Sequence, residues 1–146
     1  MKVKAMLLAV LATAMLGLSS CSTSEKTVGY KEAQRYFVRN DVTDFSPRII
    51  TSNEELDRYF GMATVMGEGG MPTPVNFDKE NVVAIILPET NIDTEIKIGS
   101  IKKQDGKLVV RYKVITSGEA RSYSTVPCQL VKVSKKYGDN VEFVKE

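Results

Sequence analysis

The chain has 146 residues, of which 20 are basic and 18 are acidic, with two cysteines and no histidine. Its small positive balance comes from Lys2 and Lys4, so the remainder lacks the basic excess that nucleic-acid binding needs. The absence of histidine removes the commonest general base and the commonest metal ligand. We therefore expect a protein that is not an enzyme and that holds no metal or other cofactor.

Residues 1–20 have the organisation of a bacterial export signal. Lys2 and Lys4 precede an apolar run from Ala5 to Leu18, and two small serines end that run. The run has about 14 residues, fewer than the ~20 that a membrane-spanning helix needs, and no stop-transfer cluster follows it. The sequence therefore predicts that this segment is removed and not retained.

The predicted cleavage position is marked by Cys21. Leu18-Ser19-Ser20-Cys21 resembles the lipobox of bacterial lipoproteins, in which the cysteine becomes the acylated first residue. Two or three acyl chains such as palmitate bind a protein firmly to a bilayer, so we expect a lipoprotein of the cell envelope, in the outer membrane and facing the periplasm. An ordinary signal peptide that ends near a cysteine is the alternative.

Behind the lipidated cysteine, residues 21–29 are expected to be a flexible tether, because they are mostly small and polar. Residues 30–146 are expected to form a single domain. Residues 35–40 are rich in strand-forming side chains and end at the turn-forming pair Asn40-Asp41, which predicts a strand. Residues 48–50 are expected to extend briefly after Pro47.

A short amphipathic helix is predicted over residues 53–60. Ser52 can cap its N-terminus, and Glu55 three residues later completes a capping box. Gly61 is expected to close the C-terminus. The spacing of its apolar residues places three of them on one face of the helix: Leu56, Tyr59 and Phe60.

Residues 61–76 contain four glycines, two prolines and three methionines, which predicts a long irregular loop. The run Gly67-Glu68-Gly69-Gly70 lacks the lysine and the flanking strand and helix of a phosphate-binding loop, so we interpret it as a source of flexibility.

The methionines of this loop, Met62, Met66 and Met71, allow two interpretations. Methionine fills irregular gaps in a core, which is the interpretation that we favour, and it also lines adaptable binding surfaces. If the loop is exposed, it becomes the leading partner-binding site. Arg121 and Tyr123 in a second loop are then secondary anchors, since both residue types are enriched at interface hot spots.

The second half of the chain predicts strands. Residues 82–87 are uninterruptedly apolar and fit a central strand covered on both faces. In residues 94–103 the apolar phase breaks at Gly99, which indicates a β-bulge. Asp105-Gly106 is typical of a tight hairpin turn that leads into an alternating strand over residues 108–115.

Two further strands are expected near the C-terminus. One covers residues 126–136, where the apolar phase slips between Leu130 and Val131, and another covers residues 141–144. Together these elements predict an α+β domain, with a mostly antiparallel sheet of five to seven strands and one short helix packed on it. A small β-barrel or sandwich with an appended helix is the alternative.

Three patterns that suggest catalysis have simpler explanations. Cys128 lies in phase with strand residues Val126 and Leu130, so we interpret it as a buried, inert side chain. Ser100 and Lys103 match the Ser-x-x-Lys spacing of penicillin-binding enzymes, but in a strand they point to opposite faces. A carboxylate dyad is a remaining alternative among acids at strand ends: Asp78, Glu80, Glu89, Asp93 and Glu95.

Several segments of the second half share a pattern with one family. They are Val75-Asn76-Phe77-Asp78, Val82-Val83-Ala84-Ile85-Ile86, Glu95-Ile96-Lys97-Ile98, Gly106-Lys107-Leu108-Val109-Val110 and residues 127–133. On the pattern of these segments, residues 74–144 resemble the C-terminal domain of the PrcB-like family, which consists of accessory lipoproteins that stabilise a cell-surface protease complex. Where that family often has a glycine-rich turn after its apolar strand, this chain has Pro88-Glu89-Thr90-Asn91. The resemblance implies a non-enzymatic, protein-binding role.

The sequence thus favours a lipid-anchored module that binds a protein of the envelope, which the resemblance suggests is a protease, through residues 61–76 and an exposed sheet edge. A small-ligand-binding envelope lipoprotein and a histidine-free hydrolase are the alternatives. The former would need a sizeable apolar cavity.

Overall fold

The computed structural model describes residues 25–146, and the predicted export signal and Cys21 lie outside this part. Within residues 25–146 there are ten strands, one α-helix and one turn of 3-10 helix. They are β1 (Lys26–Thr27), β2 (Tyr30–Glu32), β3 (Tyr36–Val38), β4 (Arg48–Ile50), α1 (Asn53–Tyr59), β5 (Phe60–Met62), β6 (Glu80–Ile86), β7 (Asp93–Gln104), β8 (Lys107–Ser117), β9 (Cys128–Ser134), η1 (Lys135–Tyr137) and β10 (Val141–Lys145).

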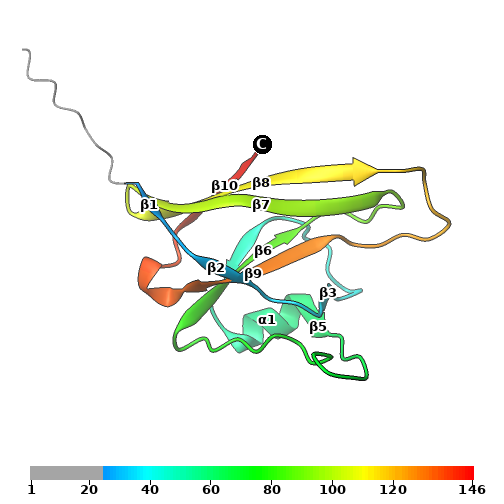
Figure 1. The fold of residues 1–146 in the computed structure, drawn as a ribbon, viewed down its shortest axis with the longest axis horizontal. Coiled ribbons are helices and arrows are strands. Elements are labelled where there is room, and N and C mark those ends of the chain that lie inside the picture. The colour runs from blue at the N-terminus through cyan, green and yellow to red at the C-terminus, as the bar shows by residue number, and fades with distance from the viewer. Residues whose placement is uncertain (1–24) are drawn as a thin grey trace, which may run out of the picture.

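The elements form three layers, which Figure 1 shows one above the other. The outer sheet has the strand order β1-β7-β8-β10, and the central sheet has the order β2-β9-β6-β4. The third layer consists of α1 and the two-stranded β3–β5 ribbon. All strand pairs are antiparallel except β8 and β10, which run parallel.

The predicted mostly antiparallel β-structure with one short packed helix is therefore confirmed, but the predicted number of strands is too low. Two four-stranded sheets face each other, which is closer to the sandwich alternative than to a single sheet. Very short strands such as β1 and β2 escaped the sequence analysis, because two or three residues carry no detectable apolar alternation.

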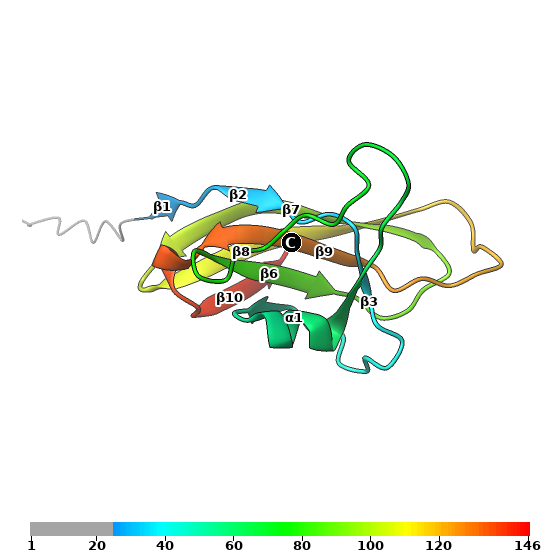
Figure 2. The same ribbon diagram turned by 90° about the horizontal axis from the view of Figure 1, so that it is seen from below.

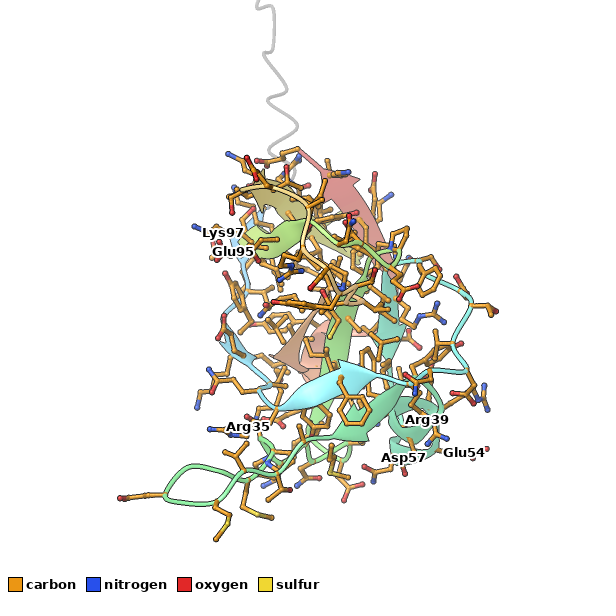
Figure 3. The ribbon with its side chains drawn as sticks, turned by 90° about the vertical axis from the view of Figure 1, so that its right-hand side faces the viewer. Arg35, Arg39, Glu54, Asp57, Glu95 and Lys97 are labelled. Carbon is orange, nitrogen blue, oxygen red and sulfur yellow. The ribbon has the colours of Figure 1, made fainter. Side chains whose placement is uncertain are left out.

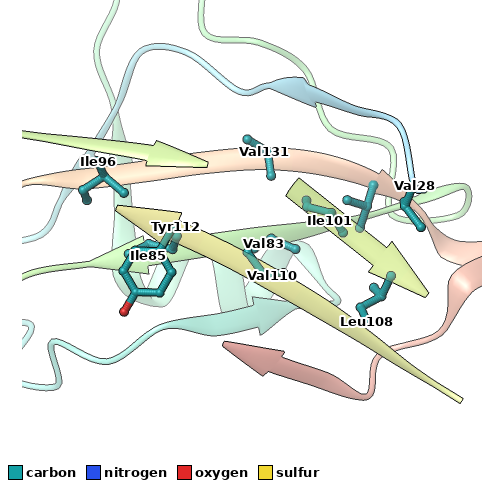
Figure 4. Packing of buried hydrophobic residues seen from close by; sticks show 10 residues of the cluster. Val28, Val83, Ile85, Ile96, Ile101, Leu108, Val110, Tyr112 and Val131 are labelled. Carbon is teal, nitrogen blue, oxygen red and sulfur yellow. The ribbon is translucent and has the colours of Figure 1, made fainter. Parts of the chain in front are cut away.

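The first core fills the space between the outer and central sheets, as Figure 4 shows from close by. Its buried side chains come from both sheets and from the segment after β1: Val28, Val83, Ile85, Ile96, Ile101, Leu108, Val110, Tyr112, Val131 and Val133. Burial of this apolar surface is the main force that holds the two sheets together.

The second core lies on the opposite face of the central sheet, between that sheet and the third layer. Its buried members are Ala33, Val38, Ile50, Leu56, Phe60, Phe77, Val82, Ala84, Ile86 and Leu130. Because both cores use it, β6 is buried on both faces from Asn81 to Ile86, as its uninterrupted apolar run predicted.

The same arrangement explains the apparent phase slip in β9. Leu130 belongs to the second core and Val131 to the first, so adjacent apolar residues serve opposite faces of one regular strand. The strand is also shorter than predicted, because it ends at Ser134 and residues 135–137 form η1.

The predicted β7–β8 hairpin is confirmed in detail. Asp105 and Gly106 have φ angles of 49° and 80°, and Gln104 pairs with Lys107 across the turn. Both angles are in the left-handed region that a two-residue hairpin turn requires. The strand register shifts between Ile98 and Ser100, so the predicted bulge at Gly99 is also present.

The helix begins as predicted and ends differently. The Ser52 hydroxyl accepts a hydrogen bond from the Glu55 amide at 3.2 Å, and the Glu55 carboxylate accepts one from the Thr51 amide at 3.2 Å. At the other end Phe60 is extended (φ −127°, ψ 142°), so the chain passes directly into β5. The expectation that Gly61 closes the helix is therefore wrong, and Gly61 instead lies inside a strand.

The domain also begins earlier than expected. Residues 26–27 pair with β7, the Val28 amide donates to the Ile101 carbonyl at 2.8 Å, and the Val28 side chain is buried in the first core. Residues 26–28 therefore belong to the folded domain and not to the tether that was expected over residues 21–29. Of the residues described, none lies in a helix that is long and apolar enough to span a membrane.

Candidate interaction surface

The segment from residue 61 to residue 76, the methionine loop, is fastened at its base to the residues that lead into β3. The Ala63 amide donates to the Arg35 carbonyl at 2.9 Å, and the Thr73 amide donates to the Gln34 carbonyl at 3.1 Å. The Gln34 amide donates to the Thr73 hydroxyl at 2.9 Å, and the Tyr36 hydroxyl donates to the Thr73 carbonyl at 2.6 Å. Both ends of the loop are therefore held by one short segment.

Burial, with a smaller effect of the Asp57 charge, raises the pKa of Tyr36 above its ordinary value. Its hydroxyl therefore stays protonated and continues to donate to Thr73 throughout the neutral range. The loop is also tied to the central sheet, since the Lys132 ammonium donates to the Pro74 carbonyl at 3.1 Å.

The tip of the loop is a compact turn that depends on glycine. The Val65 amide donates to the Gly70 carbonyl at 2.9 Å, and the Gly70 amide donates to the Gly67 carbonyl at 3.2 Å. Gly67 and Gly69 have positive φ angles of 111° and 71°, and a β-carbon on Gly70 would lie 1.9 Å from the Val65 carbonyl oxygen. These glycines thus serve a defined turn, and flexibility is not needed to explain them.

The methionines of the loop lie in solvent and not in the core. The exposed fraction is 60% for Met62, 102% for Met66 and 72% for Met71. The interpretation that these side chains fill core gaps is therefore wrong, because both cores are already filled by strand and helix residues. In Figure 3 the loop extends at the lower left, beyond the labelled Arg35, whose Nε donates to the Gly69 carbonyl at 2.8 Å.

Next to the loop, the β3–β5 ribbon adds an exposed aromatic ring. Phe37 pairs with Gly61, and a β-carbon on Gly61 would lie 2.3 Å from the Phe37 ring, so the ring rests directly on the glycine backbone. A shallow hollow of about 460 Å³ lies beside it, with the ion-paired Arg39 and Asp41, and Asn40, as the rest of its lining. The ribbon thus presents an apolar surface with a polar rim, which is the usual composition of a protein interface.

The sequence analysis identified the methionines but missed Phe37 and Val65, which are each about half exposed. Alternation in the predicted strand over residues 35–40 could have found Phe37. Val38 is buried in the second core and Tyr36 packs against it, so the residue between them must point the other way.

Arg121 and Tyr123 do not join this surface. The Arg121 guanidinium stacks on the Tyr123 ring, with 4.6 Å to the ring centroid, and Arg121 also donates to the Asn91 carbonyl and the Thr125 hydroxyl. Arg121 thus holds its own loop against the residues before β7, while Tyr123 remains exposed. Figure 1 shows this segment, in orange, running from the end of β8 to β9, whereas the methionine loop belongs to the third layer.

The residues considered for catalysis lie in settings that do not activate them. Burial raises the pKa of Cys128 to about 11, which leaves almost no thiolate at neutral pH. The Lys103 ammonium donates to the Tyr137 carbonyl at 2.5 Å, and Ser100 lies on the same strand three residues away.

Among the acids, Glu80 lies 3.5 Å from the Lys132 ammonium, Glu95 lies 3.8 Å from that of Lys97, and Asp93 lies 3.9 Å from the guanidinium of Arg121. These three carboxylates are thus each paired with a cation and not with one another. Across residues 25–146 no group of three or more acidic or cysteine side chains is arranged to share a metal ion.

Comparison of the chain with known protein families, with curated proteins and with solved structures finds no match. The PrcB-like resemblance therefore stays a prediction that depends on the sequence pattern alone.

Proposed function

We propose that this protein is a lipid-anchored module of the bacterial envelope that binds another envelope protein through its methionine loop. The observation that supports this most directly is the exposure of Met66 and Met71 on a loop whose base and tip are held by hydrogen bonds. A pre-ordered loop loses little conformational entropy when it binds. Methionine adapts to the shape of an apolar partner surface, so the combination suits protein recognition.

The position of the loop fits an anchored protein. Cys21, the proposed lipidation site, precedes β1 by only a few residues, and β1 and the tip of the methionine loop lie toward opposite ends of the molecule (Figures 1 and 2). A lipid attached at Cys21 would therefore leave the loop facing away from the membrane. This orientation favours a partner with a domain in the same compartment, and the PrcB-like resemblance suggests a protease complex as its class.

The two alternatives have less support from the described residues. A carrier of small apolar ligands needs an interior cavity, whereas the space between the two sheets is occupied by ten buried side chains of the first core. A hydrolase that uses Cys128 needs a thiolate, whereas burial favours the thiol.

Site-specific photo-crosslinking in living cells tests the proposal. A photoreactive amino acid at Met66 is expected to give one dominant crosslinked envelope protein. The same amino acid at Lys145, which is exposed on β10 of the outer sheet, is expected to give none. Equal crosslinking from both positions, or none from either, would contradict the proposed surface. Mass spectrometry of the native N-terminus tests the anchor separately, because an unacylated Cys21 would remove it.

A further inference from the structure

Within residues 25–146, no strand neighbours a long part of the outer edge of β7. β1 pairs with β7 only at Lys102 and Lys103, and Val28 adds one hydrogen bond to Ile101. The chain then crosses to the central sheet, where β2 pairs with β9. From Asp93 to Gly99, therefore, β7 has β8 on one side and no strand from the described part of the chain on the other.

The backbone groups of this edge point outward at alternate residues. The Ile98 carbonyl accepts a hydrogen bond from the Tyr30 hydroxyl at 3.2 Å, from the side opposite β8. Because outward and inward groups alternate in an antiparallel strand, the amides and carbonyls of Thr94 and Ile96 face the same free edge. Such an edge is a template for another strand.

The side chains on this edge carry opposite charges on either side of one buried residue. Glu95 and Lys97 are exposed and lie at the margin of the molecule in Figure 3, while Ile96 between them is buried in the first core. Lys97 lies directly opposite Lys113 in the register of β7 and β8, and like charges at this position are unfavourable. Lys113 pairs with Glu146, and Lys97 pairs with Glu95 of its own strand at 3.8 Å. Both pairs are exposed, and the free side of Lys97 can accept a further acidic neighbour.

We propose that this edge of β7 pairs in antiparallel fashion with the same edge of a second copy of the chain, about a two-fold axis at Ile96. In this register Glu95 lies opposite Lys97 of the second copy and Lys97 lies opposite its Glu95. The outward groups of Ile96 face their own counterparts, and Thr94 faces Ile98. The dimer thus gains two opposite-charge pairs across the new contact.

The charges select this register among its neighbours. A two-fold axis at residue 95 would place Glu95 opposite Glu95, and an axis at residue 97 would place Lys97 opposite Lys97. The backbone favours the same register, because an axis at residue 95 leaves Ile98 opposite Ile92 outside β7, and an axis at residue 97 leaves Thr94 opposite Ser100 beyond the bulge. Only the axis at Ile96 places both Glu95 and Lys97 opposite a residue of opposite charge, because an axis at residue 95 pairs Lys97 with Asp93 but sets Glu95 against Glu95.

Two features of the surroundings fit a second strand. A groove of about 300 Å³ lies beside this edge. Ile96, Ile98 and Val131 form its apolar part, and its polar lining includes Tyr30, Glu32 and Gln129. The inward side chains of the second copy would contact the apolar part. The Tyr30 hydroxyl donates to one lone pair of the Ile98 carbonyl oxygen, and the second lone pair remains free to accept a hydrogen bond from an amide of the second copy.

Charge reversal provides the test. The full chain, purified in a detergent matched in density by the solvent, is examined by sedimentation equilibrium at low salt. The wild type is expected to show a reversible monomer–dimer equilibrium, and E95K and K97E are each expected to raise the dimer Kd about tenfold. The double variant E95K/K97E restores opposite charges and is expected to return the Kd to the wild-type value.

Lys145→Glu is the matched control, because it makes the same charge change at an exposed residue of β10, on the other side of the outer sheet. Its dimer Kd is expected to equal that of the wild type. A wild type that stays monomeric up to its solubility limit would overturn the proposal. A dimer that the single reversals leave intact, or that the double variant fails to restore, would overturn it as well.

A zero-length carbodiimide crosslink on a mixture of ordinary and nitrogen-15-labelled chains gives an independent measurement. The expected product joins Glu95 of one chain to Lys97 of a chain with the other label. A linkage found only within equally labelled chains would contradict the intermolecular pair.

Discussion

Strand β6 and the methionine loop are both rich in apolar side chains, but those of β6 are buried and those of the loop are largely exposed. From Val82 to Ile86 the strand is fully buried, whereas Met66 at the tip of the loop is fully exposed. The backbone explains the difference. β6 pairs with β4 on one side and β9 on the other, so its amides and carbonyls have partners inside the protein.

Beyond Met62, where β5 ends, the methionine loop pairs with no strand of the described residues. Its glycines and prolines prevent a regular ladder, and its hydrogen bonds to the rest of the protein involve residues near its two ends and Arg35. The tip must therefore stay where water can reach its backbone. The comparison shows that apolar composition leads to burial only where the backbone can also be satisfied.

The largest expected effect concerns the buried strand. Ile85→Ala is expected to lower the free energy of unfolding by about 2–5 kcal/mol, because the deletion leaves a cavity between the two sheets. Urea denaturation followed by circular dichroism measures this change. Ile115→Ala is the matched control, since Ile115 is exposed near the end of β8, and it is expected to cost less than about 1 kcal/mol. Equal losses in the two variants would contradict the assigned burial.

A pH effect is expected at Cys128, the first residue of β9. The folded state raises the pKa of Cys128 from 9.0 to about 11, chiefly through burial. Between these pH values the folded protein keeps a proton that the unfolded chain has lost. Its contribution to stability, about 2–3 kcal/mol, is therefore complete below pH 9.0 and is lost as the pH rises to about 11.

Urea denaturation at several pH values, compared between the wild type and Cys128→Ala, isolates this contribution from the titration of lysines and tyrosines. The variant is expected to lose less stability than the wild type across the same interval. Parallel losses would show that Cys128 is not buried as described.

A smaller and local effect is expected at the tip of the methionine loop. Gly70→Ala forces a β-carbon against the Val65 carbonyl, so the turn is expected to open and to lose more than about 1 kcal/mol of local stability. Hydrogen exchange of the Val65 amide, which is bonded to the Gly70 carbonyl, reports this opening. Gly29→Ala serves as the control, because its added β-carbon meets no atom within 4 Å, and it is expected to leave the exchange of that amide unchanged.

The smallest effect on stability is expected at the most exposed residue. Met66→Ser is expected to change the free energy of unfolding by less than about 0.5 kcal/mol, because the side chain has no buried contacts to lose. Recovery of the partner identified by photo-crosslinking is nevertheless expected to fall several-fold, since an apolar anchor is removed. Undiminished recovery together with unchanged stability would place the binding surface elsewhere.

The sequence alone determined those elements whose cause is local. The helix start follows from Ser52 and Glu55, the β7–β8 hairpin from Asp105-Gly106, and the bulge from Gly99, because each depends on residues adjacent along the chain. The doubly buried β6 was also predictable, since only a strand covered on both faces accepts an uninterrupted apolar run.

Only the tertiary structure decided how these pieces share their surfaces. It placed residues 26–28 in the outer sheet and the first core, gave adjacent residues of β9 to different cores, and put the methionines in solvent. It also set Phe37 on Gly61 and left one edge of β7 free. These outcomes depend on strand pairings between residues far apart in the chain, and the apolar pattern of a single segment carries no information about which neighbour it will meet.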